Sequence, residues 1–382
     1  MRTLVLLSLA ELLGMSVWFS ASALAPQLQA AWGLRAAEAG WLTTVVQLGF
    51  VAGTAVAALL NLADLVPSRT LFAVSALAAA ACNAALLGAG ALAPALVLRF
   101  GTGFFLAGVY PPAMKMIATW YRDGRGFAIG TIVGALTVGK ATPYLVHGVG
   151  SLTLASVVVT TSLAAAAGGL LVLLWYHDGP FAFERRPFAW DLVGAVWRGR
   201  DVRLAIGGYL GHMWELYAMW TWIAAFLASG VALAPRAADV LAFAAIAAGG
   251  SGCVVGGRLA DRWGRERLTV WSMAVSGCCA ALIGLAAPSP SVAIAVALVW
   301  GFAVVADSAQ FSALVTELAP PHAVGTALTL QTSLGFLLTM ASIQLVPRLA
   351  GLVGWRWAFV VLAGGPALGI PAMERLRRLR GL

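Results

Sequence analysis

The chain is poor in charged side chains. Asp, Glu, Lys and Arg together make up 10% of its 382 residues, whereas soluble globular proteins carry about 25%. Hydrophobic residues account for 61%, and the mean hydropathy is +0.90. A chain of this composition is solvated mainly by lipid, which excludes a soluble globular protein.

The sequence also lacks the motifs of nucleotide-driven and catalytic proteins. It contains no Walker loop, no GxGxxG after a strand and no catalytic serine–histidine grouping. Its four cysteines lie in apolar runs without the paired spacing of a zinc or redox site, and we expect them to be small core residues: Cys82, Cys253, Cys278 and Cys279. We therefore expect no metal, no cofactor and no enzymatic activity, and any active transport must draw on an ion or substrate gradient.

Apolar runs of about twenty residues, long enough to cross about 30 Å of hydrocarbon as helix, recur along the whole chain. We count about twelve, near residues 3–26, 40–60, 69–90, 94–119, 126–148, 152–175, 203–229, 236–258, 268–287, 291–316, 324–346 and 353–374. The first lacks a small-residue cleavage site and is expected to be a retained helix. The pattern predicts an all-α polytopic membrane protein.

The net charge of +9 follows from the loops and indicates no nucleic-acid partner. If the N-terminus is cytoplasmic, 17 of the 24 basic residues lie in loops or tails on that side. Only Arg35, Arg236, Arg348 and Arg356 lie on the other. This is the positive-inside bias. It predicts a multi-pass protein of a bacterial-type inner (plasma) membrane with both termini cytoplasmic.

The chain divides into two similar halves. The polar segment 176–202 separates about six apolar runs from about six. Leu62-Ala63-Asp64 matches Leu259-Ala260-Asp261, 197 positions later. We expect an N-terminal six-helix bundle over 1–175, a cytoplasmic linker over 176–202, and a pseudo-symmetric C-terminal bundle with a basic tail over 203–382. Parallel repeats of this kind bind their substrate near the membrane midplane, between the halves.

The most specific motif lies in the second half. Residues 257–267 read Gly-Arg-Leu-Ala-Asp-Arg-Trp-Gly-Arg-Glu-Arg. They resemble the loop motif of the major facilitator superfamily, G-x-L-a-D-r-x-G-r-r, and the resemblance covers nearly the whole chain. It implies a transporter and a cytoplasmic latch that favours one facing state.

The resemblance implies the residues of that latch. In the second half they are Gly257, Asp261, Arg262, Gly264 and Arg265, with Asp261 beside a helix end and paired with loop arginines. The first-half copy, residues 60–69, keeps Asp64 and Arg69 but has leucine and proline in place of both glycines.

Two further features refine the resemblance. Arg99-Phe-Gly-Thr-Gly103 is similar to the R-x-x-x-G motif that the superfamily links to proton coupling, although Arg99 could instead snorkel to the outer interface. Gly126, Gly130 and Gly134 form a stripe that allows close helix contact. Together with the segment from Tyr110 to Tyr121, the pattern looks most like the anion-handling branches, such as the nitrate and organic-anion porters.

Lysine is almost absent, and the two that occur lie inside apolar runs. A lysine in hydrocarbon is costly unless it faces the protein interior, a polar path or a partner. Lys115 follows Pro111-Pro112, which kink the helix, and either lines the pathway with Tyr110 or reaches carbonyls at the inner interface. For Lys140, contact with an anionic substrate, an ion pair with Glu11 or Glu215, and a peripheral position all remain open.

Acidic and histidine side chains inside membrane helices mark proton relays. Glu11 lies midway along the first run, where it could be a proton site or a lysine counter-ion. His212 and Glu215 share one face of the seventh helix, either as a proton-handling pair or as satisfied core groups. With Arg99, these residues are the expected proton-coupling set.

The remaining pathway candidates are aromatic or polar. Trp214 and Tyr217 lie at the depth of Glu215 and are expected cavity walls, and Asp307 and Gln310 give the tenth helix a polar stretch. Aromatics at helical spacing are otherwise packing residues.

These features favour a secondary transporter of a small carboxylate-like anion, proton-coupled, monomeric, and working by rocking of the two bundles. Its partners would be the solute, a proton and the lipid bilayer. The first alternative is proton-driven efflux of lipophilic cations, and the second is a membrane sensor or scaffold that does not transport.

Overall fold

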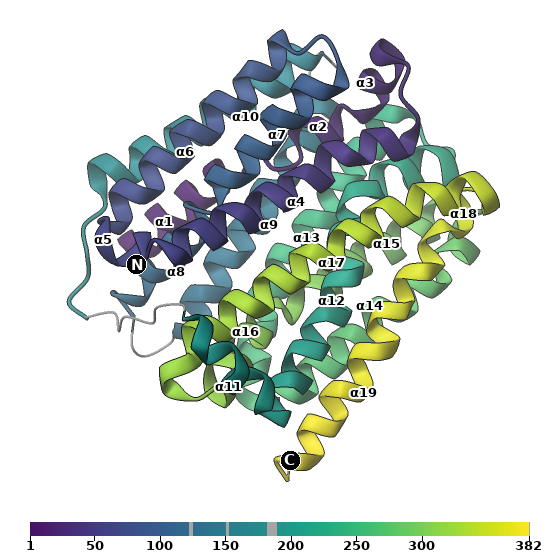
Figure 1. Ribbon diagram of the computed structural model, residues 1–382. Coiled ribbons are helices and arrows are strands. Elements are labelled where there is room, and N and C mark those ends of the chain that lie inside the picture. Colours follow the sequence, from purple (N-terminus) through teal and green to yellow (C-terminus); the bar gives the residue numbers. More distant parts are fainter. Residues whose placement is uncertain (122–124, 150–152, 182–188, 382) are drawn as a thin grey trace.

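The computed structural model describes residues 1–121, 125–149, 153–181 and 189–381, and this part of the chain is helical without strands. The helices group into twelve rods, each a single pass through the molecule (Figure 1). An even number of passes returns the chain to the end at which it began. The prediction of an all-α polytopic membrane protein is therefore confirmed.

The first six rods hold the first half of the chain. They consist of α1 (Arg2–Met15) with α2 (Ser20–Ala23) and α3 (Ala25–Trp32), α4 (Ala36–Leu59), α6 (Ser68–Ala84), α7 (Leu92–Leu106) with α8 (Tyr110–Ala118), α9 (Arg125–Val149) and α10 (Leu154–Trp175). The short α5 (Leu62–Leu65) connects α4 to α6.

The last six rods follow a short linker helix, α11 (Val193–Arg198). They consist of α12 (Arg200–Ala225), α13 (Pro235–Trp263), α14 (Arg265–Ala286), α15 (Pro290–Ala306) with α16 (Ser308–Leu318), α17 (Val324–Val353), and α18 (Trp355–Ala358) with α19 (Gly364–Leu379). We call the end of the molecule where α1, α9 and α12 begin the arginine-rich end, and the other the opposite end.

Ten helices of the described chain are long and apolar enough to cross a membrane, and the first and seventh rods are not among them. The expected continuous helix over 3–26 is wrong, because α1 stops at Met15 and a turn separates it from α2. At 14 residues, α1 spans about 21 Å, less than the hydrocarbon thickness. In α12, a histidine, a glutamate and several aromatic residues lower the hydropathy. The two rods that miss the criterion, one through its short helix and one through its polar residues, are the first rods of the two halves.

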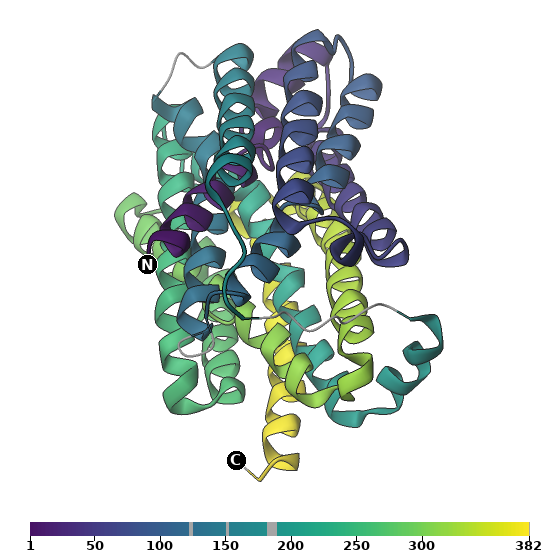
Figure 2. The same cartoon turned by 90° about the vertical axis from the view of Figure 1, so that its left-hand side faces the viewer.

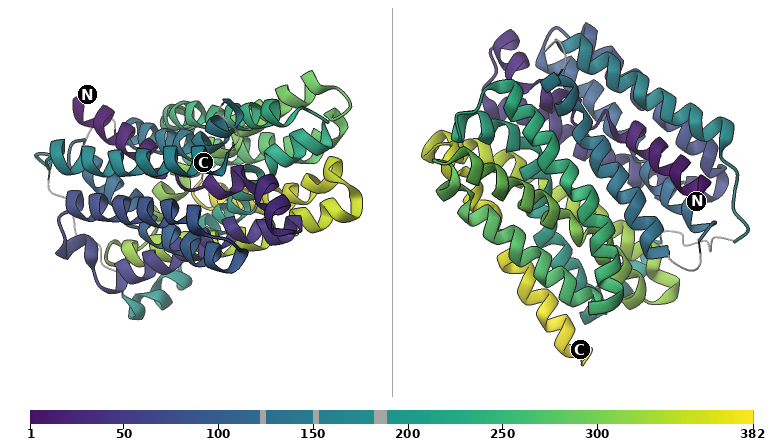
Figure 3. Two further views of the ribbon diagram at one scale, coloured as in Figure 1. Left: turned by 90° about the horizontal axis from the view of Figure 1, so that it is seen from above. Right: turned by 180° about the vertical axis from the view of Figure 1, so that it is seen from behind.

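The two halves of the chain occupy opposite sides of the molecule. The purple-to-blue half and the green-to-yellow half face each other in Figures 1 and 2, and the views in Figure 3 agree. Two helix pairs form most of the contact between them, α9 with α13 and α4 with α17. Any site between the halves must lie along these pairs.

The glycine stripe of α9 forms one of these contacts. A Cβ atom added at Gly134 would lie 2.7 Å from the carbonyl oxygen of Gly250 on α13, and one at Gly130 would lie 3.1 Å from that of Cys253. The two backbones therefore touch with no side chain between them, as small-residue stripes permit. Gly139, five positions past Gly134, packs against α1 at Leu12 instead.

Arg99 holds the break in the first rod. Its side chain is fully buried, so it does not snorkel to an interface. Its guanidinium donates to the backbone oxygens of Val17, Trp18 and Leu42 and to the side chains of Ser20 and Asn83. Val17 and Trp18 lie in the turn between α1 and α2, where the helical ladder is interrupted. A planar group with five donors suits carbonyls spread over several elements.

The cysteines are not all core residues. Cys253 is buried and Cys82 and Cys279 are half-buried, but Cys278 is exposed on α14. A cysteine on an outward helix face of a membrane protein contacts lipid, so the apolar setting that suggested a core position is the bilayer.

We expect Gly134→Ala to destabilise the protein although alanine is the better helix former. Its methyl group would collide with the backbone of Gly250, and overpacking of this kind costs about 1–3 kcal/mol. Gly364→Ala is the matched control, because no atom lies within 4 Å of its added Cβ. Melting temperatures in detergent should fall for the first variant only; equal values would contradict close contact between α9 and α13.

We expect Arg99→Lys to destabilise the protein as well. A lysine supplies three donors from one point and leaves some of the five acceptors unpaired, at about 1–3 kcal/mol for each buried group. Arg348→Lys, at an exposed position of α17, is the control and should keep the wild-type melting temperature. If Arg99→Lys melts like the wild type but transports nothing, Arg99 acts in the transport cycle and not in holding the break.

Candidate functional site

Lys140 lies near the middle of α9, at the contact between the two halves. Its side chain is 2% exposed, and Nζ donates a hydrogen bond of 2.5 Å to the hydroxyl of Tyr217 on α12. Nζ also lies 3.7 Å from the ring centroid of Trp18, 4.7 Å from that of Tyr217 and 5.7 Å from that of Trp220. The ammonium group is thus enclosed by aromatic faces from both halves, an arrangement that stabilises a cation.

The aromatic rings around Lys140 belong to one cluster that joins the halves. Trp18 lies 5.2 Å from Phe50 of α4, 5.8 Å from Tyr217 and 5.9 Å from Phe336 of α17, between ring centroids. Phe50 and Phe336 lie 4.7 Å apart. We refer to Trp18, Phe50, Tyr217, Trp220 and Phe336 as the aromatic cage. The cage fills the midplane, so any solute binding there must displace these side chains.

Trp18 has its position because of the break in the first rod. It lies in the turn after α1, and Arg99 holds its backbone. The sequence analysis did not select Trp18, Phe50, Trp220 or Phe336. The sequence around an aromatic residue in an apolar helix is the same whether its ring packs against a cationic or an apolar side chain. Tyr217 was expected as a cavity wall, and it contacts Lys140 directly.

Lys140 has no carboxylate partner. Within the described residues no ion pair joins it to an acid within 4 Å. Glu11 is itself fully buried, and neither of its carboxylate oxygens has a hydrogen-bond partner in the structure. The ion pair considered with Glu11 or Glu215 does not form, and a peripheral position is excluded by burial.

Other buried polar groups are also without partners. Both amide atoms of Gln47 on α4 and of Gln331 on α17 are fully buried and unpaired, as are the indole nitrogens of Trp18 and Trp220. Buried polar groups are almost always hydrogen-bonded, and the exceptions point to a bound molecule or a functional role. A glutamine within an apolar run is as costly as other polar groups there, so the rule that selected the lysines could also have found these two.

The acids of the second half are satisfied differently from expectation. His212 does not pair with Glu215; its Nδ1 lies 3.0 Å from a carboxylate oxygen of Asp307, and its Nε2 lies 3.0 Å from the hydroxyl of Ser308. Glu215 accepts hydrogen bonds from Ser276 at 2.8 Å and from the indole of Trp300 at 2.5 Å. Residues three apart share a helix face, but neighbouring rods supply their partners.

Several expected pathway residues lie away from Lys140. Trp214 donates to the carbonyl oxygen of Val361 in the second half, and Gln310 accepts from Arg265 near the arginine-rich end. Tyr110 and Lys115 lie on α8, both half-buried. Neither Trp214 nor Gln310 contacts the aromatic cage through these hydrogen bonds.

The loop motif lies at the arginine-rich end. Both carboxylate oxygens of Asp261 lie 3.8 Å from the Cβ that Gly126 would carry, so Asp261 faces the first turn of α9 across the two halves. A helix N-terminus favours such a negative charge. Gly257 packs on the same turn, and Gly264 has φ +86°, which a glycine adopts without strain.

Among the described side chains, no ion pair within 4 Å joins Asp261 to Arg262 or Arg265, the motif arginines expected beside it. Arg262 is exposed, and Arg265 donates to Glu317 at 2.8 Å. In the first-half copy Arg69 is exposed, and the side chain of Asp64 lies outside the described part of the structure.

Two polar contacts join the halves at the opposite end. His147 of α9 lies 2.7 Å from a carboxylate oxygen of Asp239 on α13, and both residues are buried. The amide of Gln344 on α17 lies 2.9 Å from the hydroxyl of Thr44 on α4. We refer to these two contacts as the opposite-end contacts. They were not expected, because no sequence pattern relates residues 92 or 300 positions apart.

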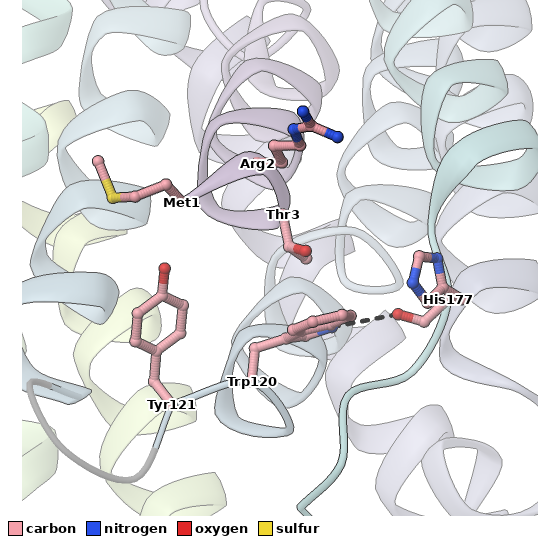
Figure 4. A pocket seen from close by; sticks show the side chains of 6 residues that line it. All are labelled: Met1, Arg2, Thr3, Trp120, Tyr121 and His177. Atoms are coloured by element: carbon pink, nitrogen blue, oxygen red, sulfur yellow. Dashed lines mark hydrogen bonds between the residues drawn. The ribbon is translucent and has the colours of Figure 1, made fainter.

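A cavity of about 500 Å³ opens at the arginine-rich end. It is lined by Met1, Arg2, Thr3, Trp120, Tyr121 and His177 (Figure 4). The indole of Trp120 donates to the carbonyl oxygen of His177 at 3.1 Å on one side of it. The cavity adjoins the first turn of α1 and contains none of the residues expected to bind substrate or proton.

Comparison with known proteins agrees with this architecture. A bacterial homologue of the human lysosomal transporter Spinster, in an inward-facing and unoccupied conformation, superimposes with a TM-score of 0.75, at 16% identity, covering 99% of this chain and 96% of that one. The nucleoside transporter NupG, as its D323A mutant, gives a TM-score of 0.73 at 15% identity, covering 98% and 99%. At such identities the likeness shows the fold alone.

No curated protein sequence matches this chain. The sequence does match the profile of the Major Facilitator Superfamily over residues 6–343, nearly the whole chain. The chain therefore belongs to the major facilitator superfamily.

Proposed function

We propose that this protein carries a small carboxylate-like anion together with a proton across the inner membrane, by alternating access between the two halves. Membership of the superfamily makes the chain a transporter and not an enzyme. The nature of the solute and the use of protons are argued here from the residues between the halves.

One observation carries the proposal: a lysine is buried between the halves with no acid within 4 Å among the described residues. Lys140 is 2% exposed and is hydrogen-bonded only to a neutral hydroxyl among the described residues. Burying a charge is costly unless it is paired. A transported anion would supply the missing charge at the depth where transporters of this architecture bind their substrates.

The neighbouring unpaired groups suit an anion with carboxylate-like oxygens. The indole nitrogens of Trp18 and Trp220 and the amide nitrogens of Gln47 and Gln331 are all donors, and all lack an acceptor. They come from both halves, since Trp18 and Gln47 belong to the first and Trp220 and Gln331 to the second. A solute held by donors on both sides would draw the halves together, as alternating access requires.

The contacts between the halves are of the kind that can separate. The α9–α13 contact rests on glycine backbones, and the opposite-end contacts are two isolated polar pairs. Separation of His147 from Asp239 and of Gln344 from Thr44 would open the opposite end. The positive-inside bias assigns the arginine-rich end to the cytoplasm, so this opening would face outward.

Proton coupling would use the buried ionisable groups that have no fixed role. Arg99 is committed to the break of the first rod, and Glu215 to Ser276 and Trp300. Glu11 and the His212–Asp307 pair remain the candidates among the acids and histidines named from the sequence, in addition to Lys140 itself.

A second candidate function is efflux of lipophilic cations. The observation in its favour is Glu11, a buried carboxyl group with both oxygens unpaired, in a protein whose midplane is rich in aromatic faces. Binding of tetraphenylphosphonium that is lost in Glu11→Gln and kept in Lys140→Ala would favour this candidate over anion transport.

We expect Lys140→Ala to abolish high-affinity anion binding. Hydrogen bonds to charged groups contribute about 1.5–3 kcal/mol, so affinity should fall by about ten- to 150-fold. The measurement is a thermal-shift titration of purified protein with formate, acetate, lactate, pyruvate, succinate and nitrate. Arg348→Ala removes an exposed cation at the opposite end and should bind like the wild type. Equal binding by Lys140→Ala and wild type would refute the anion site.

We expect Asp239→Ala to open the opposite end. Loss of its buried contact with His147 removes about 1.5–3 kcal/mol from the closed form, so the open form should become about tenfold more populated or more. The measurement is the rate at which a bulky maleimide labels Ala238→Cys, a buried position beside Asp239, in a chain without native cysteines.

The matched control for this labelling is Glu38→Ala. Glu38 is an acid at the same end that is bonded only to Arg35, three residues earlier, among the described residues. A labelling rate that rises equally in both variants, or in neither, would show that His147 and Asp239 do not hold this end closed.

A further inference from the structure

We propose that Lys140 is itself the proton carrier, so that one side chain binds the anion and takes up the coupled proton in the same step. The inference rests on the proposed anion transport. It assigns a stoichiometry of one proton to one anion charge, and it gives the acids of the protein no part in carrying that proton.

The first step concerns Lys140 in the empty site. An ammonium group has three N–H donors, and here one points to the Tyr217 hydroxyl while the others meet ring faces and no carboxylate within 4 Å among the described residues. A neutral amine fits the same geometry, because it can accept the hydroxyl proton of Tyr217 across the same 2.5 Å. The site therefore holds either protonation state without rearrangement.

The second step concerns the arrival of the anion. A negative charge beside Nζ stabilises the ammonium form and not the amine. Because linkage is reciprocal, protonation of Lys140 strengthens anion binding by the same factor by which the anion favours protonation. The balanced step adds one proton from water to the amine nitrogen, forming one N–H bond, and seats one anion against the resulting ammonium group. The reverse step releases both on the other side.

The third step concerns the passage of the halves past each other. The occupied site contains an ammonium–anion pair with no net charge, and the empty site contains an amine with none. A lone ion in the low-dielectric interior is far more costly than either. The carrier therefore changes its facing state easily when it holds both ions or neither, which prevents a leak of one without the other.

Several other acids and histidines of the packed elements pair with one another or with an arginine. On α13, Asp239 pairs with His147 of α9, and on α12 His212 pairs with Asp307. On α16, Glu317 pairs with Arg265. The helices α2 and α10 contain no titratable residue, and α8 contributes Tyr110 and Lys115, which carry no negative charge at neutral pH.

Glu11 on α1 is the rival carrier of the first half, whereas the candidates of the second half, His212 and Asp307, pair with each other. The carboxylate oxygens of Glu11 have no hydrogen-bond partner among the described residues. If Glu11 carried the proton, it would have to be ionised in the empty site, where it would hold Lys140 permanently as an ammonium ion. Lys140 would then not titrate, and removal of Glu11 would remove the coupled proton. The two candidate carriers therefore predict opposite results for proton uptake in Glu11→Gln and in Lys140→Arg.

The experiment counts protons taken up per anion bound. Purified protein in weakly buffered detergent is titrated with the six anions named above while a pH-indicator dye reports proton uptake. Wild type should take up about one proton per monovalent anion. Glu11→Gln should do the same. Lys140→Arg should bind the anion and take up about none, because a guanidinium stays charged in both states.

A second measurement does not require that Lys140→Arg folds or that its guanidinium fits within the aromatic cage. Where the amine form predominates, the dissociation constant for the anion should rise about tenfold per pH unit, in wild type and equally in Glu11→Gln. Loss of this slope in Glu11→Gln, or proton uptake that persists in Lys140→Arg, would overturn the inference and assign the proton to Glu11. If wild type binds none of the anions, the proposed function fails and the inference fails with it.

Discussion

The structure depends on a buried lysine side chain, Lys140, whose neighbours are aromatic faces and a hydroxyl, with no carboxylate within 4 Å among the described residues. Lys140 occupies the contact between two halves that otherwise meet through glycine backbones and a few polar pairs. Aromatic rings stabilise a cation less than a bonded carboxylate would, and they leave its charge available. A contact surface built around such a group is stable enough to form and is still incomplete, which suits a protein that must bind a solute there and release it.

The rigid contacts lie within a half of the protein, and the contacts that can separate lie between the two halves. Within the first half, Arg99 fixes the interrupted rod by bonding to carbonyls that the break leaves outside the helical ladder, and this holds Trp18 over Lys140. Between the halves, by contrast, the contacts lack large interlocking side chains along the glycine stripe. Since packed interiors resist deformation, motion is confined to surfaces where little has to be repacked.

The two halves treat their buried charges differently although they derive from one repeat. In the second half each buried acid has partners, His212 for Asp307, and Ser276 and Trp300 for Glu215. In the first half neither carboxylate oxygen of Glu11 has a hydrogen-bond partner among the described residues, and Lys140 bonds only the neutral hydroxyl of Tyr217. The unpaired charges, and the chemistry they permit, therefore belong to the first half.

The sequence by itself determined the helical class, nearly all of the membrane passes and the glycine contact of α9, because each follows from local composition and helical periodicity. It left open whether Lys140 is buried or peripheral. It did not reveal the break after Met15, the aromatic cage, the orphaned amides of Gln47 and Gln331, or the partners of His212 and His147. Those depend on which rods become neighbours and how they are rotated. Helical periodicity predicts which residues share one face of a helix. Only the packing of another rod against that face decides which side chains those residues contact.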